Sequence, residues 1–142
     1  MTAACELCAQ DGGEVIYRCE QYRVVLVDDA GFPGFCRVIW NAHAKEMTDL
    51  RLLERSMLMT AVLHVEQAVR DMMHPDKVNL ASLGNVVPHL HWHVIPRYLD
   101  DTHFPGPVWA VAQRAPVGAS LAARATLLPA LRQEICRLIG QP

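Results

Sequence analysis

The sequence lacks the features that mark membrane proteins and non-specific nucleic-acid binders. None of its apolar runs approaches the roughly 20 residues that a transmembrane helix needs. Its 13 basic and 15 acidic residues give a net charge of -2, whereas proteins that bind nucleic acid non-specifically normally carry a basic excess. Residues 1–6 have neither a basic segment nor an apolar core, so they do not resemble a secretory signal. We therefore expect a cytoplasmic protein that binds neither membranes nor nucleic acid.

The number of cysteines argues against a disulfide framework. The chain has five, and an odd set cannot be fully paired. Two of them form the motif Cys5-x-x-Cys8, which in a reducing compartment indicates metal or redox chemistry. A redox pair normally lies between a strand and a helix, and no such pattern surrounds this motif. A zinc site needs two further ligands, for which His43 and His89 are the candidates.

Three histidines alternate with apolar residues near the middle of the chain, at His89, His91 and His93. Successive side chains of a β-strand point to opposite faces, so the three imidazoles share one face and the apolar residues the other. Imidazoles titrate near neutral pH and bind metals. The row therefore indicates either a metal site, because His-x-His on a strand presents two ligands to zinc, or nucleophilic catalysis by an imidazole.

The segments next to the three histidines contain groups that bind anions. Gly84-Asn85 is a turn dipeptide, and a turn with glycine lets backbone amides approach a ligand closely. The histidine strand therefore begins beside a candidate phosphate cradle. Pro96 is expected to end this strand, and the next residue, Arg97, either pairs with phosphate or is solvated.

The pattern of apolar residues predicts one α+β domain with a mostly antiparallel sheet. A chain of 142 residues is long enough to bury a sizeable core. Helical periodicity predicts a long central helix that begins at Thr48 and ends at Met73, and a C-terminal helical region over 119–139. Pro129 falls in the first turn of a fresh helix there, where its missing N–H does no harm. Short apolar runs predict strands at 15–17, 23–27, 36–40, 78–83 and 90–95.

The histidine row and the residues 94–97 after it resemble the signature of the histidine triad (HIT) superfamily. The resemblance extends upstream to a second block, which comprises Pro33-Gly34, the apolar run 36–40, Asn41-Ala42-His43 and residues 47–50. It implies a HIT-like domain over residues 1–105, with residues 106–142 as a C-terminal extension packed on the same domain. It also implies a homodimer that buries the central helix and a strand.

The resemblance implies a role for each matching histidine. His91 is the nucleophile, which attacks the α-phosphorus of a nucleotide and forms a nucleotidyl-histidine that water resolves. His93 donates a hydrogen bond to a phosphate oxygen or to the leaving group. His89 orients the strand or binds zinc. Several bacterial HIT branches and the related galactose-1-phosphate uridylyltransferases hold zinc through a Cys-x-x-Cys motif, a histidine of the second block and the first triad histidine. The corresponding residues here are Cys5, Cys8, His43 and His89.

The same resemblance implies five nucleotide-binding residues, which are Asp28, Asn79, Gly84, Asn85 and His93. Asp28 matches a position that holds ribose hydroxyls, although it also lies in a turn, where aspartate is common. The sequence departs from the family at Val86, where members often have a hydroxyl residue. This departure leaves the preferred leaving group open.

We therefore expect a HIT-type hydrolase with a structural zinc ion, which transfers a nucleotidyl group from nucleoside phosphoramidates or dinucleoside polyphosphates to water. The family's uridylyltransferase branch usually has glutamine at the third triad position, so His93 favours a hydrolase. Two alternatives stay open. One is a hydrolase with a catalytic zinc ion at the histidine cluster, although His89 and His93 lie about 13 Å apart along a strand. The other is a non-catalytic nucleotide-binding protein of the same fold.

Overall fold

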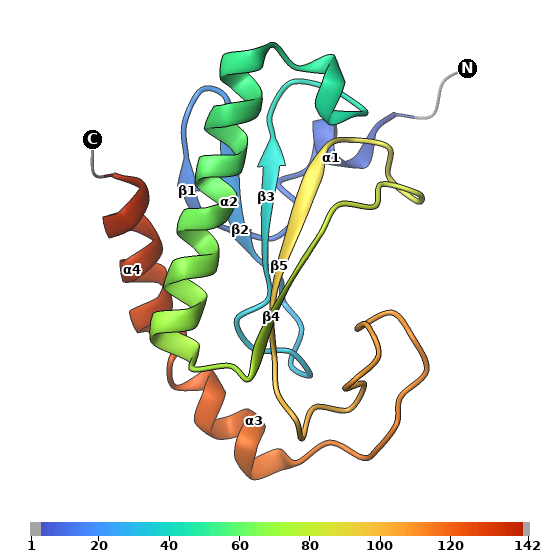
Figure 1. The fold of residues 1–142 in the computed structure, drawn as a ribbon, viewed down its shortest axis with the longest axis vertical. Helices are drawn as coiled ribbons and strands as arrows, with labels where there is room; N and C mark the ends of the chain where they lie inside the picture. The colour runs from blue at the N-terminus through green and yellow to red at the C-terminus, as the bar shows by residue number, and fades with distance from the viewer. Residues whose placement is uncertain (1–3, 141–142) are drawn as a thin grey trace.

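Five short segments rich in β-branched and aromatic residues form one antiparallel sheet in the computed structural model, which describes residues 4–140. The strands lie in the order β1-β2-β3-β5-β4 (Figure 1). All four neighbouring pairs are antiparallel. This arrangement, with its long helix and C-terminal helix, confirms the predicted α+β fold. The strands are β1 (Glu14–Arg18), β2 (Tyr22–Leu26), β3 (Cys36–Trp40), β4 (Lys77–Ala81) and β5 (His91–Arg97).

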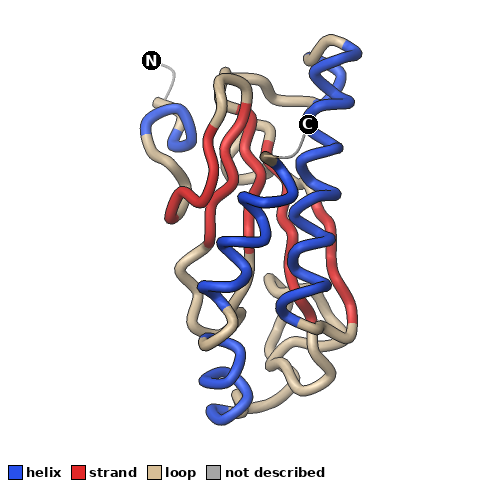
Figure 2. Tube along the Cα trace, turned by 90° about the vertical axis from the view of Figure 1, so that its left-hand side faces the viewer, coloured by secondary structure: helices blue, strands red, loops and turns tan. Residues whose placement is uncertain are grey.

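The helices divide between the two faces of this sheet (Figure 2). The long helix α2 (Leu52–Met73) and the C-terminal helix α4 (Leu128–Ile139) pack on one face. Alternate strand residues such as Val24, Val38 and Val94 form the main core there with α2 and α4. The short helix α1 (Glu6–Ala9) packs on the opposite face. The second face is therefore only partly covered by helices, and it is the face on which His91 and His93 lie.

The long helix begins later than the sequence pattern predicts. Thr48 lies in a 3₁₀ turn, η1 (Met47–Asp49), and α2 begins only at Leu52. Two carboxylates explain the delay, because each accepts backbone N–H groups that would otherwise lack a partner. Asp49 accepts the N–H groups of Lys45 and Glu46, and Glu54 accepts that of Arg51 at 2.8 Å. Two successive caps therefore separate the turn from the helix.

The prediction that Pro96 ends the histidine strand is wrong. β5 continues through Pro96 to Arg97 and pairs with β4 from His93 to Arg97. β3 pairs with β5 only as far as Val94, so Pro96 lies beyond the end of β3, where no ladder hydrogen bond requires its N–H. At the other end, His89 precedes the strand, which begins at His91.

The C-terminal part of the chain contains a long irregular segment and two helices, α3 (Gly118–Ala125) and α4. Pro129 lies in the first turn of α4, as predicted, and Leu131 and Ile135 of this helix reach the main core. The predicted division into residues 1–105 and 106–142 stays a prediction, and its outer ends, residues 1–3 and 141–142, lie outside the described residues. Within the described chain, no helix combines the length and apolarity needed to cross a membrane.

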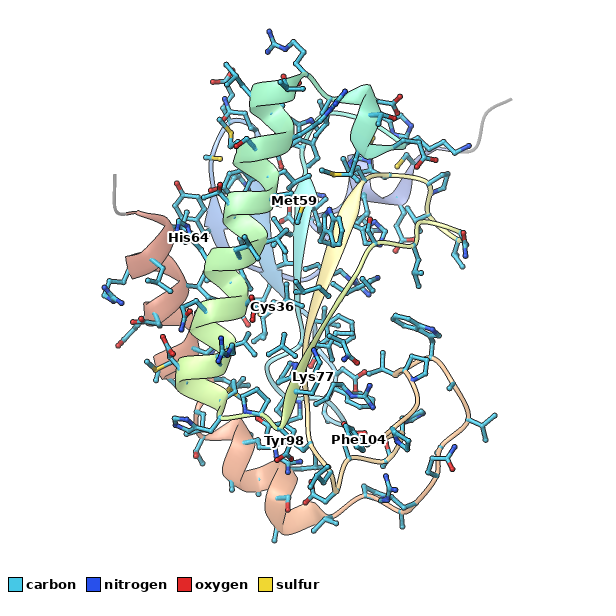
Figure 3. The ribbon with its side chains drawn as sticks, in the orientation of Figure 1. Cys36, Met59, His64, Lys77, Tyr98 and Phe104 are labelled. Atoms are coloured by element: carbon cyan, nitrogen blue, oxygen red, sulfur yellow. The ribbon has the colours of Figure 1, made fainter. Side chains whose placement is uncertain are left out.

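The segment between β5 and α3, residues 98–117, is fixed to the end of β5 by a buried ion pair. Arg97 donates to both carboxylate oxygens of Asp101, at 2.8 and 3.0 Å, and to the carbonyl of Gly106 at 2.7 Å. Asp101 in turn accepts the backbone N–H groups of Tyr98 and Phe104. Tyr98 directly follows β5, and Phe104 lies further along this segment (Figure 3). We call residues 98–117 the strap.

Candidate active site and metal centre

The pairing of β3 with β5 fixes which side chains share the histidine face. Ile39 lies opposite His91, and Arg37 lies opposite His93. Directly opposite residues of an antiparallel pair point to the same face. Because Val38 and Val94 point into the core beneath α2, the alternate residues Arg37, His91 and His93 point away from it.

His91 is held in one orientation by its own backbone. Its Nδ1 lies 2.5 Å from the carbonyl oxygen of His89, and a carbonyl only accepts, so we assign the proton to Nδ1. Burial lowers the pKa of His91, and the nearby Arg37 lowers it further, against the opposing effect of this hydrogen bond. The imidazole is therefore neutral near pH 7, and its Nε2 carries a lone pair. The hydroxyl of Ser82 donates to the His91 carbonyl at 2.7 Å and anchors the backbone at this point.

His93 is also neutral, for a related reason. Burial, with smaller contributions from His91 and Arg37, lowers its pKa to about 4. Its Nδ1 is enclosed without a hydrogen-bond partner in the described chain. A buried N–H without an acceptor is rarer than an under-used acceptor, which favours a lone pair on Nδ1 and the proton on Nε2. His93 thus has one N–H available to a ligand.

These two histidines line a cavity of about 450 Å³. The turn expected to cradle phosphate forms its rim, with Gly84 at φ +70°, a left-handed conformation that suits glycine. Val86 is 94 % exposed and offers no hydroxyl. The lining residues are Glu6, Leu7, Arg37, Leu83, Gly84, Asn85, Val86, Val87, His91, His93 and Trp109.

Arg37 and Trp109 are the most notable of the lining residues that were not identified from the sequence. Arg37 is the only charged residue in the apolar run of β3, which is a signal that the sequence does carry. Trp109 belongs to the strap, and its ring centroid lies 6.0 Å from that of His93. Nothing in the local sequence of Trp109 indicates this contact, because it depends on how the strap folds back from β5.

Four predicted metal ligands come together beside this cavity. α1 places Cys5 and Cys8 near His89, with Sγ–Nδ1 distances of 3.3 and 3.5 Å, and Cys8 Sγ lies 3.4 Å from Nδ1 of His43. One donor atom from each of the four residues lies within 4.8 Å of all the others. The Nε2–H of His89 donates to the carbonyl of Trp40 at 2.6 Å, which leaves Nδ1 as the ligand atom.

This donor set fits zinc. Tetrahedral coordination with ordinary Zn–S and Zn–N bond lengths places neighbouring donor atoms roughly 3.3–3.8 Å apart, and the three distances above lie in or at the edge of that range. Two thiolates and two imidazoles are also the ligands that a structural zinc site uses. The four donors complete the coordination, so a bound ion would have no open position.

The structure separates His89 from the other two triad members. Its ring turns toward the cysteines and stacks edge-on to His43, with centroids 5.3 Å apart, whereas His91 and His93 face the cavity. This arrangement does not match a single ion held by all three histidines. In the described chain, His89 belongs to a group of possible metal ligands with Cys5, Cys8 and His43, and neither His91 nor His93 is part of that group.

Two of the predicted nucleotide-binding residues lie outside the lining of this cavity. Asp28 is exposed and lines a separate cavity of about 910 Å³, beside α3 and α4. Asn79 accepts a hydrogen bond from Arg97 Nη1 at 2.8 Å. Their contact with a nucleotide stays a prediction. Arg97 itself is neither solvated nor exposed for phosphate, because it is 2 % exposed and paired with Asp101.

Comparisons with known proteins agree with this geometry. A family model described as HIT domain matches residues 9–100. A histidine triad protein from Bradyrhizobium japonicum is 32% identical, with a TM-score of 0.72 over 88% of this chain and 92% of its own. One from Marinobacter aquaeolei is 28% identical, with a TM-score of 0.69 over 94% and 98%. A zinc-bound histidine triad family protein from Mycobacterium smegmatis shares the fold, at 22% identity and a TM-score of 0.57 over 89% and 94%. A search of curated proteins finds no match.

Proposed function

Because this chain belongs to the family of HIT-domain proteins, we propose that it transfers a nucleotidyl group to water through a covalent intermediate on His91. The substrates are nucleoside 5′-phosphoryl compounds with a second substituent, either phosphoramidates or dinucleoside polyphosphates. The observation that carries the proposal is the hydrogen bond from His91 Nδ1 to the carbonyl of His89. It directs the Nε2 lone pair of a neutral imidazole away from the backbone, as a nucleophile requires.

In the first step, His91 Nε2 forms a bond to the α-phosphorus, and the bond from phosphorus to the leaving group breaks with its electron pair. The imidazole becomes cationic, and the His89 carbonyl stabilises the charge by accepting the Nδ1–H. His93 Nε2–H donates to a phosphate oxygen or to the departing atom. Backbone amides of the turn at Gly84 and Asn85 supply further donors to the phosphate.

In the second step, water attacks the same phosphorus and releases one proton to the solvent, while the P–N bond breaks with its electron pair on Nε2. This returns a neutral His91 and releases a nucleoside monophosphate. Imidazole is a good leaving group, so two easier displacements replace one difficult hydrolysis. His93 acts in this step on the same oxygens. Both steps use groups that already face one cavity.

Cys5, Cys8, His43 and His89 would hold a zinc ion whose contribution is structural. It would join α1 to the segment just before β5. His91, the proposed nucleophile, follows His89 by two residues. The position of His89 therefore also fixes the carbonyl oxygen that orients His91. The chemistry of the four donors and their spacing support zinc as the bound ion.

We also propose that the protein works as a homodimer through α2 and the edge strand β4. β4 is the last strand of the sheet, and an unpaired edge strand readily adds a partner. Leu52, Leu53 and Leu63 of α2 are between 51% and 83% exposed, and a partner chain would bury them. Light scattering after size-exclusion chromatography tests this, and a monomeric mass would contradict it.

His91→Ala tests the reaction. The variant should bind nucleotide and lose at least about 10,000-fold in kcat/KM, because neighbouring groups cannot replace a nucleophile. His64→Ala, on the helix α2 (Figure 3), is the matched control and should keep full activity. Mass spectrometry of wild-type protein, denatured at alkaline pH during turnover, should detect the nucleotidyl adduct. An active His91→Ala protein would refute the covalent route, and nucleotide binding without turnover in wild type would favour the non-catalytic alternative.

A further inference from the structure

We propose that Arg37 makes this site selective for substrates whose leaving group is an anionic phosphoryl chain rather than an amine. The inference rests on the proposed function and deepens it. It assigns dinucleoside polyphosphates, or nucleoside polyphosphates generally, as the preferred substrate class.

Arg37 is the one cationic residue among those that line the cavity. The one carboxylate in the lining belongs to Glu6, which is exposed. The six ion pairs of the described chain do not include Arg37. A half-buried guanidinium without a carboxylate partner carries a desolvation cost that an anionic ligand would offset.

The hydrogen bonds of Arg37 are also incomplete. Nη1 donates to the carbonyl of Gly12 at 3.1 Å, which holds one side of the guanidinium. Nε is enclosed and has no acceptor in the described chain, and buried polar groups rarely lack one. The Phe35 ring lies under the guanidinium, 5.7 Å from its carbon, and limits its movement. The result is a fixed, under-used fork of donors at a cavity wall, which suits phosphate.

The position of Arg37 along the sheet assigns this charge to the leaving group. Arg37 lies directly opposite His93, whereas the residue opposite His91 is the apolar Ile39. Directly opposite side chains have Cβ atoms about 5 Å apart, so Arg37 and His93 can contact the same or adjacent phosphates. His93 is the residue proposed to donate to a phosphate oxygen or to the departing atom. Val86, which also lines the cavity, provides no hydroxyl, so Arg37 is the strongest side-chain donor among the lining residues.

The two substrate classes make different demands at this point. When the P–O bond of a polyphosphate breaks, the electron pair stays on the bridging oxygen, and the leaving chain gains negative charge that a fixed guanidinium stabilises. When a P–N bond breaks, the amine must take up a proton and leaves without negative charge. A neutral His93 beside a permanent cation suits the departure of an anionic polyphosphate chain. The overall reaction consumes one water and yields a nucleoside monophosphate and a nucleoside polyphosphate.

The test compares two substrates that share the adenylyl group, diadenosine tetraphosphate and adenosine 5′-phosphoramidate. Arg37→Met keeps the apolar stem of the side chain, and Arg37→Lys keeps the charge without the fork. Arg137→Met removes one exposed charge from α4 as a control. Arg37→Met should lower kcat/KM for the tetraphosphate about 30-fold or more and for the phosphoramidate by less than about 3-fold. Arg37→Lys should fall between wild type and Arg37→Met, and Arg137→Met should match wild type on both substrates.

The possible failures are distinguishable. Equal losses on both substrates, or none on the tetraphosphate, would overturn the assignment of Arg37 while leaving the proposed function intact. Wild-type protein that turns over neither substrate would overturn the proposed function, and the selectivity with it. Calorimetric titration with inorganic tripolyphosphate reports on Arg37 without turnover. The affinity should fall about 10-fold or more in Arg37→Met, and an unchanged affinity would overturn the anion site itself.

Discussion

Replacing Asp101 with asparagine should destabilise the protein strongly, because it leaves a buried arginine without its counter-charge. Arg97 and Asp101 are 2 % exposed at the side chain and joined by two hydrogen bonds. Burial alone would raise the pKa of Asp101, but the Arg97 side chain and the backbone N–H groups of Tyr98 and His103 outweigh it and hold the pKa below its ordinary value of 3.8. Removing one partner of a buried pair typically costs 3–5 kcal/mol. Because the asparagine keeps a side-chain acceptor for the backbone N–H groups, we expect a loss at the low end of this range, about 3 kcal/mol in the free energy of unfolding.

Urea unfolding followed by tryptophan fluorescence measures this loss. A group whose pKa is lower in the folded protein stabilises it above its unfolded pKa and stops doing so as the pH falls through its folded pKa. The difference between wild type and Asp101→Asn should therefore be full at pH 7 and shrink below about pH 4. The double variant Asp101→Asn/Arg97→Met should lose less unfolding free energy than the sum of the losses in the two single variants, by at least about 1 kcal/mol. A loss under about 1 kcal/mol at pH 7, or one that does not depend on pH, would refute the reasoning.

Three further predictions concern the two sites. Burial lowers the pKa of His93 from 6.5 to about 4, so wild type should lose up to about 3 kcal/mol of unfolding free energy as the pH falls from 6.5 to 4. His93→Asn should lose less over the same range, and identical pH profiles of the two proteins in urea unfolding would contradict this role of His93. Cys8→Ser should remove zinc from the purified protein and lower Tm by about 5 °C or more, whereas the exposed Cys136→Ser should change neither; metal analysis that finds equal zinc in both would contradict the site. If Asp28 holds the ribose, Asp28→Ala should lower the ratio of kcat/KM for a ribose substrate to that for its 2′-deoxy analogue by about 10-fold or more, and an unchanged ratio would make it only a turn residue.

The fold was predictable because its main elements depend on local patterns. The alternation of polar and apolar residues around His91 sets one face toward the core and the other toward a cavity, and it needs no knowledge of distant contacts. The start of α2 was not predictable in the same way. Thr48 is a good capping residue, but the structure uses the carboxylates of Asp49 and Glu54 instead. Several residues can cap a helix, and their competition is settled by packing.

The candidate site was predictable where a motif fixes the spacing and not where chain segments meet by tertiary folding. Cys5, Cys8, His43 and His89 were chosen from the sequence and the family resemblance, and their donor atoms do come together. Trp109 reaches the cavity only because Arg97 and Asp101 fix the strap. That ion pair also explains why Arg97, four residues from a triad histidine, does not face the cavity. Asp101, four positions further along the chain, accepts hydrogen bonds from its Nε and Nη2.

The proposed zinc ligands are separated in the sequence, and this separation sets an order of events during synthesis. Cys5 and Cys8 precede His89 by 84 and 81 residues. At typical translation rates of 5–20 residues per second, roughly 4–17 s pass between the appearance of the first ligand and the last. His43 appears midway, so a nascent chain can offer two thiols and one imidazole, with an open coordination position, before β5 exists. His91 follows the last of the four proposed ligands by two residues, so the proposed nucleophile is synthesised only after every proposed zinc ligand is present in the chain.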